Sequence, residues 1–584
     1  MRSAQHYSRH RHGSARWSTA ADLGALLNGS GPQLGYFDGK PLKYAAMDGP
    51  CMTIGGAGCG KLTSLVSYLL AGMGWADGQV PPTFLFDPAG QGTAIALPYQ
   101  LELGRPAYVL NPHGLHGDIL PSHRTNPLDF LTPKSPSLVS DCSLSAEMVI
   151  ALSQGSAESQ FFDAMTRRWV SVGLQWKVLR DGHVTLTSLR DFLASLVTDN
   201  DYFKETLKDM GKEAPLPLAT EALEFFEMKQ TAEKMFMGVV ATYKNAFKPL
   251  EDPQIAETFS GNDFSLGVLT DRDTRFPGPP LVSFVIPGEF KHTWNPITRL
   301  VIGSTMLRAQ RRRPGSLRPY FLIDEAATLG RAEFLLTAFS EGRKFFSTHT
   351  IYQSIGQLNR HFTDDGAREI LSSCSALQFM GVRDLATAKM VSEMIGTTTL
   401  DVPKEVDRHD RRHASMAAWR DLVLYDVPLP ETMAKARHEM RQARHHIEKQ
   451  SRELLRPEEV LGLSDSEQVI SIKGYPPILA EKRPYFLDKS MAGRYFPDPY
   501  HPPLDAVLVQ TSLGPRTRAV VWSDVPKHLA HWPQHATGRY ARLASDAAAR
   551  GYGQGDRGLL TAWHRLVSTL VAYVAKAIGR HIPI

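Results

Sequence analysis

The sequence predicts an α/β protein in which an all-helical segment interrupts a mostly parallel sheet. Three observations indicate this class. Between about residues 46 and 143, short apolar runs alternate with turns and a helical stretch, as in βαβ units. Between about 144 and 262, apolar residues recur at helical spacing and strand signals are few. From about 280, short and wholly apolar runs return, as expected of strands buried on both faces of a sheet.

The individual elements follow from these patterns in chain order. The expected strands are Leu34–Phe37, Cys51–Ile54, Thr83–Phe86, Ala107–Leu110, Leu281–Ile286, Tyr320–Ile323, Thr348–Tyr352, Ala376–Phe379 and Gln468–Ile472. The expected helices are Leu62–Met73, Ser159–Leu179, Thr187–Leu196, Leu216–Phe247 and Thr298–Arg311.

Composition and charge exclude several classes of protein. Of 584 residues, 42% are hydrophobic and 21% are charged, which excludes a mainly disordered, collagen-like or coiled-coil chain. The net charge of +5 permits contact with nucleic acid but does not argue for it. The four cysteines, Cys51, Cys59, Cys142 and Cys374, form no CxxC pair, so we expect reduced thiols rather than a disulfide framework or a zinc site.

The ends of the chain and one internal segment are rich in polar or charged residues. Met1–Trp17 has no apolar core, so it is not a signal peptide. Leu559–Ile584 contains charges that break its apolar run; we expect an amphipathic helix on the protein's own surface, with a membrane-surface or partner-binding helix as the alternative. The charge-dense segment 403–455 includes Lys435–Arg452, which predicts a solvated helix with ion pairs or, alternatively, a nucleic-acid or acidic-partner contact.

A glycine-rich turn lies between the strand Cys51–Ile54 and the helix Leu62–Met73, and it matches G-x-x-x-x-G-K. Such glycines let successive backbone N–H groups cradle phosphate oxygens, and the following helix N-terminus adds partial positive charge. Lys61 would neutralise the β- and γ-phosphates of ATP. The alternative is a strand-to-helix turn with a chance lysine. The candidate nucleotide-binding residues are Gly55, Gly56, Ala57, Gly58, Cys59, Gly60, Lys61, Leu62 and Thr63.

The eighth position of this motif departs from the usual pattern. A hydroxyl residue normally ligates Mg²⁺ there, but this chain has Leu62, and Thr63 follows one residue later. One helical step turns a side chain by about 100°, so Thr63 faces a different direction. Thr63 is the candidate Mg²⁺ ligand from this helix, and Leu62 argues against efficient hydrolysis.

The second half of the site is expected after the buried strand Tyr320–Ile323, which ends in Asp324 and Glu325. Asp324 would hold Mg²⁺ directly or through water, and Glu325 would polarise the attacking water as general base. The helical segment lies between the two halves, which predicts five segments. They are an N-terminal extension (1–45), a nucleotide-binding domain in two parts (46–143 and 263–500), an all-α domain (144–262) and a C-terminal extension (501–584).

At these residues the chain resembles the type IV secretion coupling proteins, the TraG-like conjugation ATPases of the wider FtsK/HerA group of RecA-fold motors. The likeness covers roughly residues 45 to 490, with Leu85–Gly90, Leu110–Pro112 and Thr125–Asp129 among its shared turns. Its most specific stretch is Phe321–Gln357. The resemblance implies a RecA-like P-loop NTPase core with an inserted all-α domain.

The resemblance also implies roles for two further residues. Arg343 would be an arginine finger that reaches the neighbouring subunit's nucleotide, and Gln353 would sense the γ-phosphate. From the residues alone, the alternative interpretations are a surface ion-pair residue for Arg343 and a strand-end cap for Gln353. A finger requires an active site between subunits. The implied assembly is a homo-hexamer; a monomer in the absence of substrate is the alternative. The central channel of the hexamer would hold single-stranded DNA by phosphate contacts without reading its sequence.

The expected function is an ATP-driven coupling protein that recruits a relaxase–DNA complex or an effector protein and delivers it to a type IV secretion channel. Members of the family usually begin with transmembrane helices, whereas here the P-loop starts at Gly55. We therefore expect a soluble, cytoplasmic member without that anchor. Peripheral association at the inner membrane is the alternative. One alternative is a nucleotide-binding substrate receptor that hydrolyses little. Another is a DNA-packaging or plasmid-mobilisation ATPase unconnected to secretion.

Overall fold

The structure is a computed structural model that describes two compact units. The described residues are 13–44, 49–76, 80–153, 155–403 and 447–544, together with Met416, Arg420, Pro428, Pro430, Glu431, Met433 and Ala434. The small unit combines the N-terminal segment up to Thr19 with Arg383–Leu463 and Gly474–Ile478, and the large unit holds the rest. The predicted helix Leu559–Ile584 and most of the charge-dense segment 403–455 lie outside the described residues.

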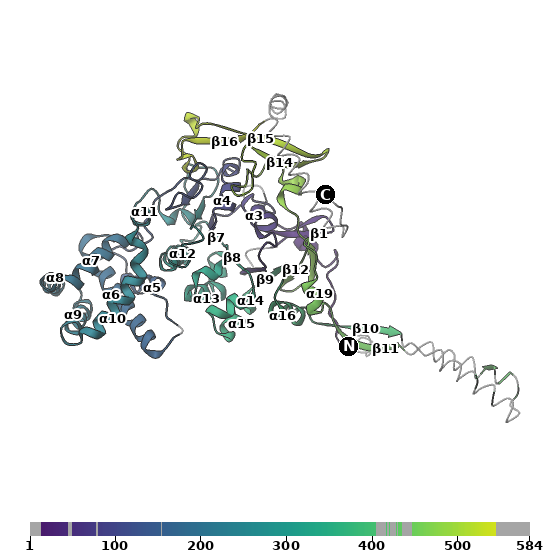
Figure 1. The fold of residues 1–584 in the computed structure, drawn as a ribbon, viewed down its shortest axis with the longest axis horizontal. Helices are drawn as coiled ribbons and strands as arrows, with labels where there is room; N and C mark the ends of the chain where they lie inside the picture. The colour runs from purple at the N-terminus through teal and green to yellow at the C-terminus, as the bar shows by residue number, and fades with distance from the viewer. Residues whose placement is uncertain are drawn as a thin grey trace. The chain divides into compact units, whose positions relative to one another are not determined.

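Within the described residues, 11 strands form one mostly parallel sheet, as predicted (Figure 1). Its order is β2-β1-β13-β12-β9-β3-β8-β7-β4-β6-β5. The strands are β1 (Gln33–Phe37), β2 (Lys40–Lys43), β3 (Cys51–Gly55), β4 (Thr83–Phe86), β5 (Ala107–Leu110), β6 (Leu281–Phe284), β7 (Tyr320–Ile323), β8 (Ser347–Tyr352), β9 (Ala376–Met380), β12 (Glu467–Ile472) and β13 (Ile478–Glu481). All pairings from β9 to β5 are parallel. Strand β12 pairs antiparallel with β9, and β1 pairs antiparallel with β13 and β2.

The central strands are buried on both faces, which explains their apolar sequences. Every residue of β3, β4, β5, β6, β7 and β8 is buried, as expected where helices cover both sides of a parallel sheet. All the predicted strands are present, with small differences at their ends. The helices of this core are α2 (Gly24–Asn28), α3 (Ser67–Leu70), α4 (Gln91–Ala96), α12 (Asn295–Gln310), α13 (Glu333–Ser340), α14 (Ile355–His361) and α15 (Asp364–Ser373).

The helix after the glycine-rich turn differs from its prediction. It begins as a π-helix, η2 (Leu62–Val66), and continues as α3. It ends at Leu70 rather than at Met73, because Gly72 has a φ of +70°, a left-handed conformation that stops a helix.

The predicted all-helical segment is present and packs on its own aromatic core. Its helices are α5 (Leu138–Val149), α6 (Ala157–Asp181), α7 (Leu186–Thr198), α8 (Asn200–Glu213), α9 (Leu216–Thr231), α10 (Glu233–Phe247) and α11 (Pro253–Thr258). Trp169 is fully buried and its ring contacts three phenylalanine rings from α8, α9 and α10. The prediction of one helix over Leu216–Phe247 is wrong, because Ala232, with a φ of −134°, separates α9 from α10. No helix in the described ranges has the length and apolar composition needed to cross a bilayer.

The described residues of the small unit form a two-stranded antiparallel sheet and two helices. Its elements are α16 (Leu385–Ile395), β10 (Thr397–Pro403), β11 (Ile447–Glu453) and α19 (Pro457–Leu461). Helix α16 packs against α19. The Ser392 hydroxyl ties the two segments together because it donates to the Leu455 carbonyl at 2.6 Å.

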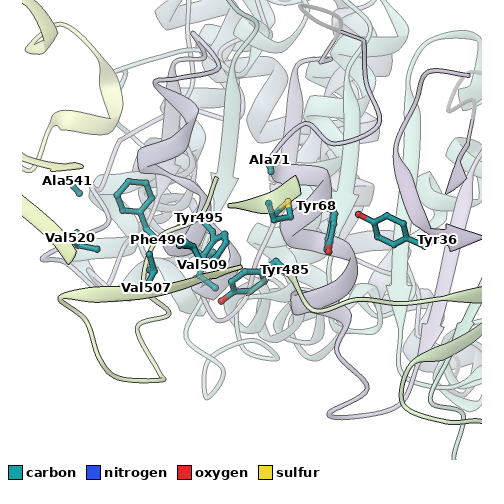
Figure 2. Packing of buried hydrophobic residues seen from close by; sticks show 12 residues of the cluster. Tyr36, Tyr68, Ala71, Tyr485, Tyr495, Phe496, Val507, Val509, Val520 and Ala541 are labelled. Carbon is teal, nitrogen blue, oxygen red and sulfur yellow. The ribbon is translucent and has the colours of Figure 1, made fainter. Parts of the chain in front are cut away.

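The region after residue 500 forms a three-stranded antiparallel sheet that the sequence did not predict. Its strands are β14 (Ala506–Thr511), β15 (Gly514–Asp524) and β16 (Arg539–Leu543). The sheet packs on α3 through a tyrosine cluster (Figure 2), made of Tyr36, Tyr68, Ala71, Ile95, Tyr485, Met491, Tyr495, Phe496, Val507, Val509, Val520 and Ala541. The C-terminal sheet therefore supports the helix that follows the glycine-rich turn.

Candidate nucleotide site

Sheet order brings the two halves of the predicted site to one edge. Strand β8 lies between β3 and β7, and the three run parallel. The glycine-rich turn follows β3, Gln353 follows β8, and Asp324 and Glu325 follow β7. The carboxyl ends of parallel strands share one edge, where ligands of open α/β sheets bind. Arg343 is not part of this group, because it precedes β8 and so lies at the opposite edge.

Two hydrogen bonds from other parts of the chain hold the glycine-rich turn, one at Gly56 and one at Cys59. Gly58 and Gly60 have φ values of +72° and +86°, which residues with a Cβ rarely adopt. The Gly56 N–H donates to the carbonyl of Met380 at 3.2 Å. Lys482, only 4% exposed, donates from Nζ to the Cys59 carbonyl at 2.8 Å, and burial lowers its pKa. These contacts fix the backbone whose N–H groups would face phosphate.

Lys61 belongs to the same electrostatic site as Asp324. Its Nζ donates to the Gly55 carbonyl at 2.9 Å. Its charge also acts on the Asp324 carboxyl, because Lys61 lowers the pKa of that group. The ammonium group therefore lies across the turn, within electrostatic reach of the acidic side of the site.

Asp87 is a second carboxylate beside Asp324 that the sequence analysis did not select. It follows β4, the neighbour of β7, and its Oδ2 accepts hydrogen bonds from the Thr93 backbone N–H at 2.7 Å and from its hydroxyl at 2.8 Å. Desolvation first, and then Asp87, raises the pKa of Asp324 to about 6. Burial also raises the pKa of Asp87. A cation at Asp324 would relieve this repulsion.

Glu325 has a strained backbone and an ion pair. Its φ of +54° is left-handed, which is uncommon for a residue other than glycine and typical of functional positions. Its N–H donates to Asp324 Oδ1 at 3.0 Å, and Lys291 Nζ donates to its Oε1 at 2.7 Å. Lys291 lies in the loop between β6 and α12, and no sequence pattern singled it out.

The hydroxyl and apolar side chains after Lys61 point in different directions. Thr63 Oγ1 donates to the Gly60 carbonyl at 3.2 Å, and Ser64 Oγ donates to the same oxygen at 2.6 Å. Leu62 packs against the tyrosine cluster, and its Cδ1 is 3.2 Å from where a Cβ on Gly92 would lie. Leu62 therefore presents an apolar side chain next to α4, where the motif usually places a hydroxyl.

Gln353 and Arg343 occupy opposite ends of β8. The Gln353 backbone N–H donates to Gln357 Oε1 at 2.8 Å, and the residue is partly exposed. Arg343 lies in the 3-10 helix η7 (Gly342–Lys344) and is exposed. Within one chain Arg343 is therefore at the sheet edge away from Lys61.

The residues present fit a magnesium–nucleotide complex in most respects. Backbone N–H groups of the turn and Lys61 are suited to phosphate oxygens. Asp324 supplies an oxygen ligand of the kind that Mg²⁺ prefers, and its raised pKa matches a site that a cation would stabilise. The side chain of Leu62 supplies no ligand, so the oxygen ligand expected from the start of this helix falls to Thr63, together with Asp324 and water.

A family model and several known proteins are similar to this chain. The model described as type IV secretory system conjugative DNA transfer matches residues 35–418 and 430–502. The coupling protein VirD4 of Bartonella quintana is 28% identical over 289 residues, which is 49% of this chain and 40% of that protein. The conjugal transfer protein TraG of Rhizobium radiobacter is 26% identical over 448 residues, 75% of this chain and 62% of that protein. The chain thus matches about two-fifths to three-fifths of these relatives' lengths.

Solved structures share the fold. The bacterial conjugative coupling protein TrwBdeltaN70 has a TM-score of 0.55 and 16% identity, over 80% of this chain and 93% of that one. The plasmid coupling protein TrwB in complex with ADP and Mg²⁺ has a TM-score of 0.55 and 15% identity, with the same coverage. At this identity the likeness concerns the fold, which is a large mostly parallel sheet with an added helical domain.

Proposed function

The chain belongs to the type IV secretory system conjugative DNA transfer family, and from this premise we propose that it is an ATP-driven coupling protein. In this proposal it recruits relaxase–DNA complexes or secreted proteins and delivers them to a type IV secretion channel. Its active form is a homo-hexamer whose central channel holds single-stranded DNA by phosphate contacts. It works in the cytoplasm, or at the inner-membrane surface.

The observation that carries this proposal is the meeting of Lys61 and Asp324 at one sheet edge. The N–H groups of the turn bind phosphate oxygens, and the Lys61 ammonium group leaves the Gly55 carbonyl to donate to the same phosphate oxygens. Asp324, once ionised, holds Mg²⁺, which when bound neutralises charge on the phosphates. Glu325 takes a proton from the attacking water. The ion pair with Lys291, whose Nζ lies 2.7 Å from Glu325 Oε1, holds the carboxylate in place for this step.

Steady-state ATP hydrolysis with and without single-stranded DNA tests the proposal. We expect turnover that DNA stimulates, and loss of turnover in Lys61→Ala, Asp324→Ala and Glu325→Gln. Lys212→Ala, at an exposed position on α8, is the matched control and keeps wild-type turnover. A folded Lys61→Ala protein with undiminished turnover would contradict the proposed site.

Leu62 favours a second candidate, a substrate receptor that binds nucleotide but hydrolyses little. Its side chain packs beside α4 and offers no oxygen to a cation. Leu62→Ser restores the hydroxyl, and Leu62→Ala removes the same packing without restoring it. If turnover of Leu62→Ser exceeds that of Leu62→Ala and of the wild type by about tenfold, a barrier change of about 1.4 kcal/mol, the native site is impaired and the receptor is favoured. Equal turnover of all three favours the motor.

A further inference from the structure

We propose that Arg318 is a positioning residue for Arg343. Its guanidinium fixes the short helix η7, so that Arg343 projects toward the nucleotide of a neighbouring subunit. This inference rests on the homo-hexamer of the proposed function and on the cross-subunit role that the family resemblance implies for Arg343.

Two arginines hold the backbone around Arg343. Arg318 Nη2 donates to the carbonyl of Arg343 and, at 3.2 Å, to that of Phe346. Arg312 Nε donates to the carbonyl of Phe345 at 3.0 Å. Both donors come from the loop that precedes β7, so the segment 343–346 is tied to the neighbouring strand by side chains as well as by sheet pairing.

The turn itself is tightly packed, which limits its freedom further. Gly342 is buried, and a Cβ at this position would lie 2.7 Å from the Phe346 ring. Only a glycine allows the chain to pass the ring this closely. The Arg343 side chain is nevertheless exposed and forms no ion pair with any described residue. A fixed backbone thus carries an outward-facing guanidinium.

Fold stability alone is a poor explanation for this arrangement. Burial lowers the pKa of Arg318, and the charge of Arg312 lowers it further. Neither arginine forms an ion pair with a carboxylate of the described residues. Like charges that share a partly buried site repel each other, and this repulsion opposes the stabilisation that the hydrogen bonds to the carbonyls provide. The exposed Arg343 guanidinium is left available to an anion brought by a second copy, and a triphosphate has the matching charge.

The first measurement is steady-state ATP hydrolysis with single-stranded DNA present. Arg318→Ala leaves the turn after β3 intact but frees η7, so we expect KM within about twofold of wild type and kcat lower by about 100-fold, as for a small displacement of a group that must be aligned. Arg318→Lys keeps the charge and one donor and should retain more turnover than Arg318→Ala. It also keeps the test informative if Arg318→Ala fails to fold. Arg313→Ala, in the same loop and exposed, is the matched control.

Mixed assemblies separate a positioning role from a structural one. A Lys61→Ala subunit has a defective phosphate site but an intact Arg318–Arg343 pair, and an Arg318→Ala subunit has the reverse. If Arg318 acts through Arg343 on the neighbouring subunit, a one-to-one mixture hydrolyses ATP faster than the sum of the two proteins assayed separately. If Arg318 acts only through Arg343, the double variant Arg318→Ala/Arg343→Ala should hydrolyse ATP as fast as Arg343→Ala alone.

The outcomes distinguish this inference from the function on which it rests. If Lys61→Ala and Arg343→Ala do not complement each other, Arg343 does not act across subunits and the role of Arg318 falls with it, whereas the proposed ATPase function stands or falls on the turnover of Lys61→Ala, Asp324→Ala and Glu325→Gln. If that pair complements but Lys61→Ala and Arg318→Ala do not, only the role of Arg318 is overturned. Wild-type kcat in Arg318→Ala overturns it as well.

Discussion

At the scale of single residues, the site is governed by two carboxyl groups on adjacent strand ends. Asp87 is buried and bonded to Thr93, and its charge helps raise the pKa of Asp324 to about 6. Lys61 opposes this shift from across the turn. The protonation state of Asp324 therefore changes just below neutral pH, which links cation binding to pH.

The first prediction concerns this link. Below about pH 6 the proton competes with Mg²⁺ for Asp324, so affinity for magnesium–nucleotide should fall as pH falls, approaching about tenfold per pH unit. Asp87→Asn removes the neighbouring charge and lowers the pKa of Asp324, so the decline should begin at lower pH. Fluorescent-nucleotide titrations from pH 5 to 7.5 measure this. Magnesium-free binding is the control, and equal pH dependence with and without Mg²⁺ would contradict the prediction.

At the scale of elements, a chain of polar side chains crosses the buried centre of the sheet. Tyr320 OH lies 2.8 Å from His349 Nδ1, and His349 Nε2 lies 2.7 Å from Thr53 Oγ1. Thr53 donates to Gln378 Oε1 at 2.8 Å, and Gln378 donates to Gln468 Oε1 at 2.8 Å. Because Thr53 donates onward, its oxygen accepts from His349 Nε2–H, and Nδ1 accepts from Tyr320. The network therefore ties strands β7, β8, β3, β9 and β12 together and requires a neutral His349.

The second prediction follows from that requirement. Burial lowers the pKa of His349 to about 3, against roughly 6.5 in an unfolded chain. Below roughly pH 6.5 this histidine is protonated in the unfolded state but stays neutral in the folded state. The free energy of unfolding should therefore fall by up to about 1.4 kcal/mol per pH unit, down to about pH 3. His349→Gln keeps hydrogen-bonding groups but does not titrate. Urea unfolding between pH 7 and 5 should show a shallower slope for this variant, and identical slopes would refute the assignment.

At the scale of the whole molecule, distant parts of the sequence support the glycine-rich turn. The tyrosine cluster joins α3, directly behind the turn, to β14, β15 and β16 (Figure 2). Tyr68 OH donates to Asp488 Oδ2 at 2.8 Å, and the Phe496 N–H donates to the Ile95 carbonyl at 2.9 Å. The C-terminal sheet is therefore part of the structure that holds the candidate site.

The third prediction tests this support. Phe496 is 7% exposed in the cluster, so Phe496→Ala should cost about 3–5 kcal/mol of unfolding free energy and should weaken nucleotide binding. Leu513→Ala is the matched control, because Leu513 is 81% exposed at the tip between β14 and β15, and its effect should stay within about 0.5 kcal/mol. Chemical unfolding and nucleotide titration give both values. Unchanged nucleotide affinity in a destabilised Phe496→Ala protein would show that the cluster supports only the fold.

The sequence was sufficient for those features that depend on local pattern. The wholly apolar runs of β5 and β7 predicted buried strands, and the residues that follow β3 and β7 predicted the two halves of the site. Asp87 and Lys291 were missed because their roles depend on which strands and loops are neighbours, and strand order is not a local property. The strand β15 was missed because most of its side chains are not buried, which leaves no apolar pattern. Helix α8 was missed because only Phe203, Thr206 and Met210 of its residues are buried.

The most direct test of the account is a structure of the chain with Mg²⁺ and a non-hydrolysable ATP analogue. We predict that Lys61 Nζ leaves the Gly55 carbonyl for phosphate oxygens, and that Asp324 holds Mg²⁺ directly or through one water. A triphosphate bound elsewhere, or bound at the turn with Asp324 out of reach of the metal and its waters, would contradict the claim that these two strand ends form one site.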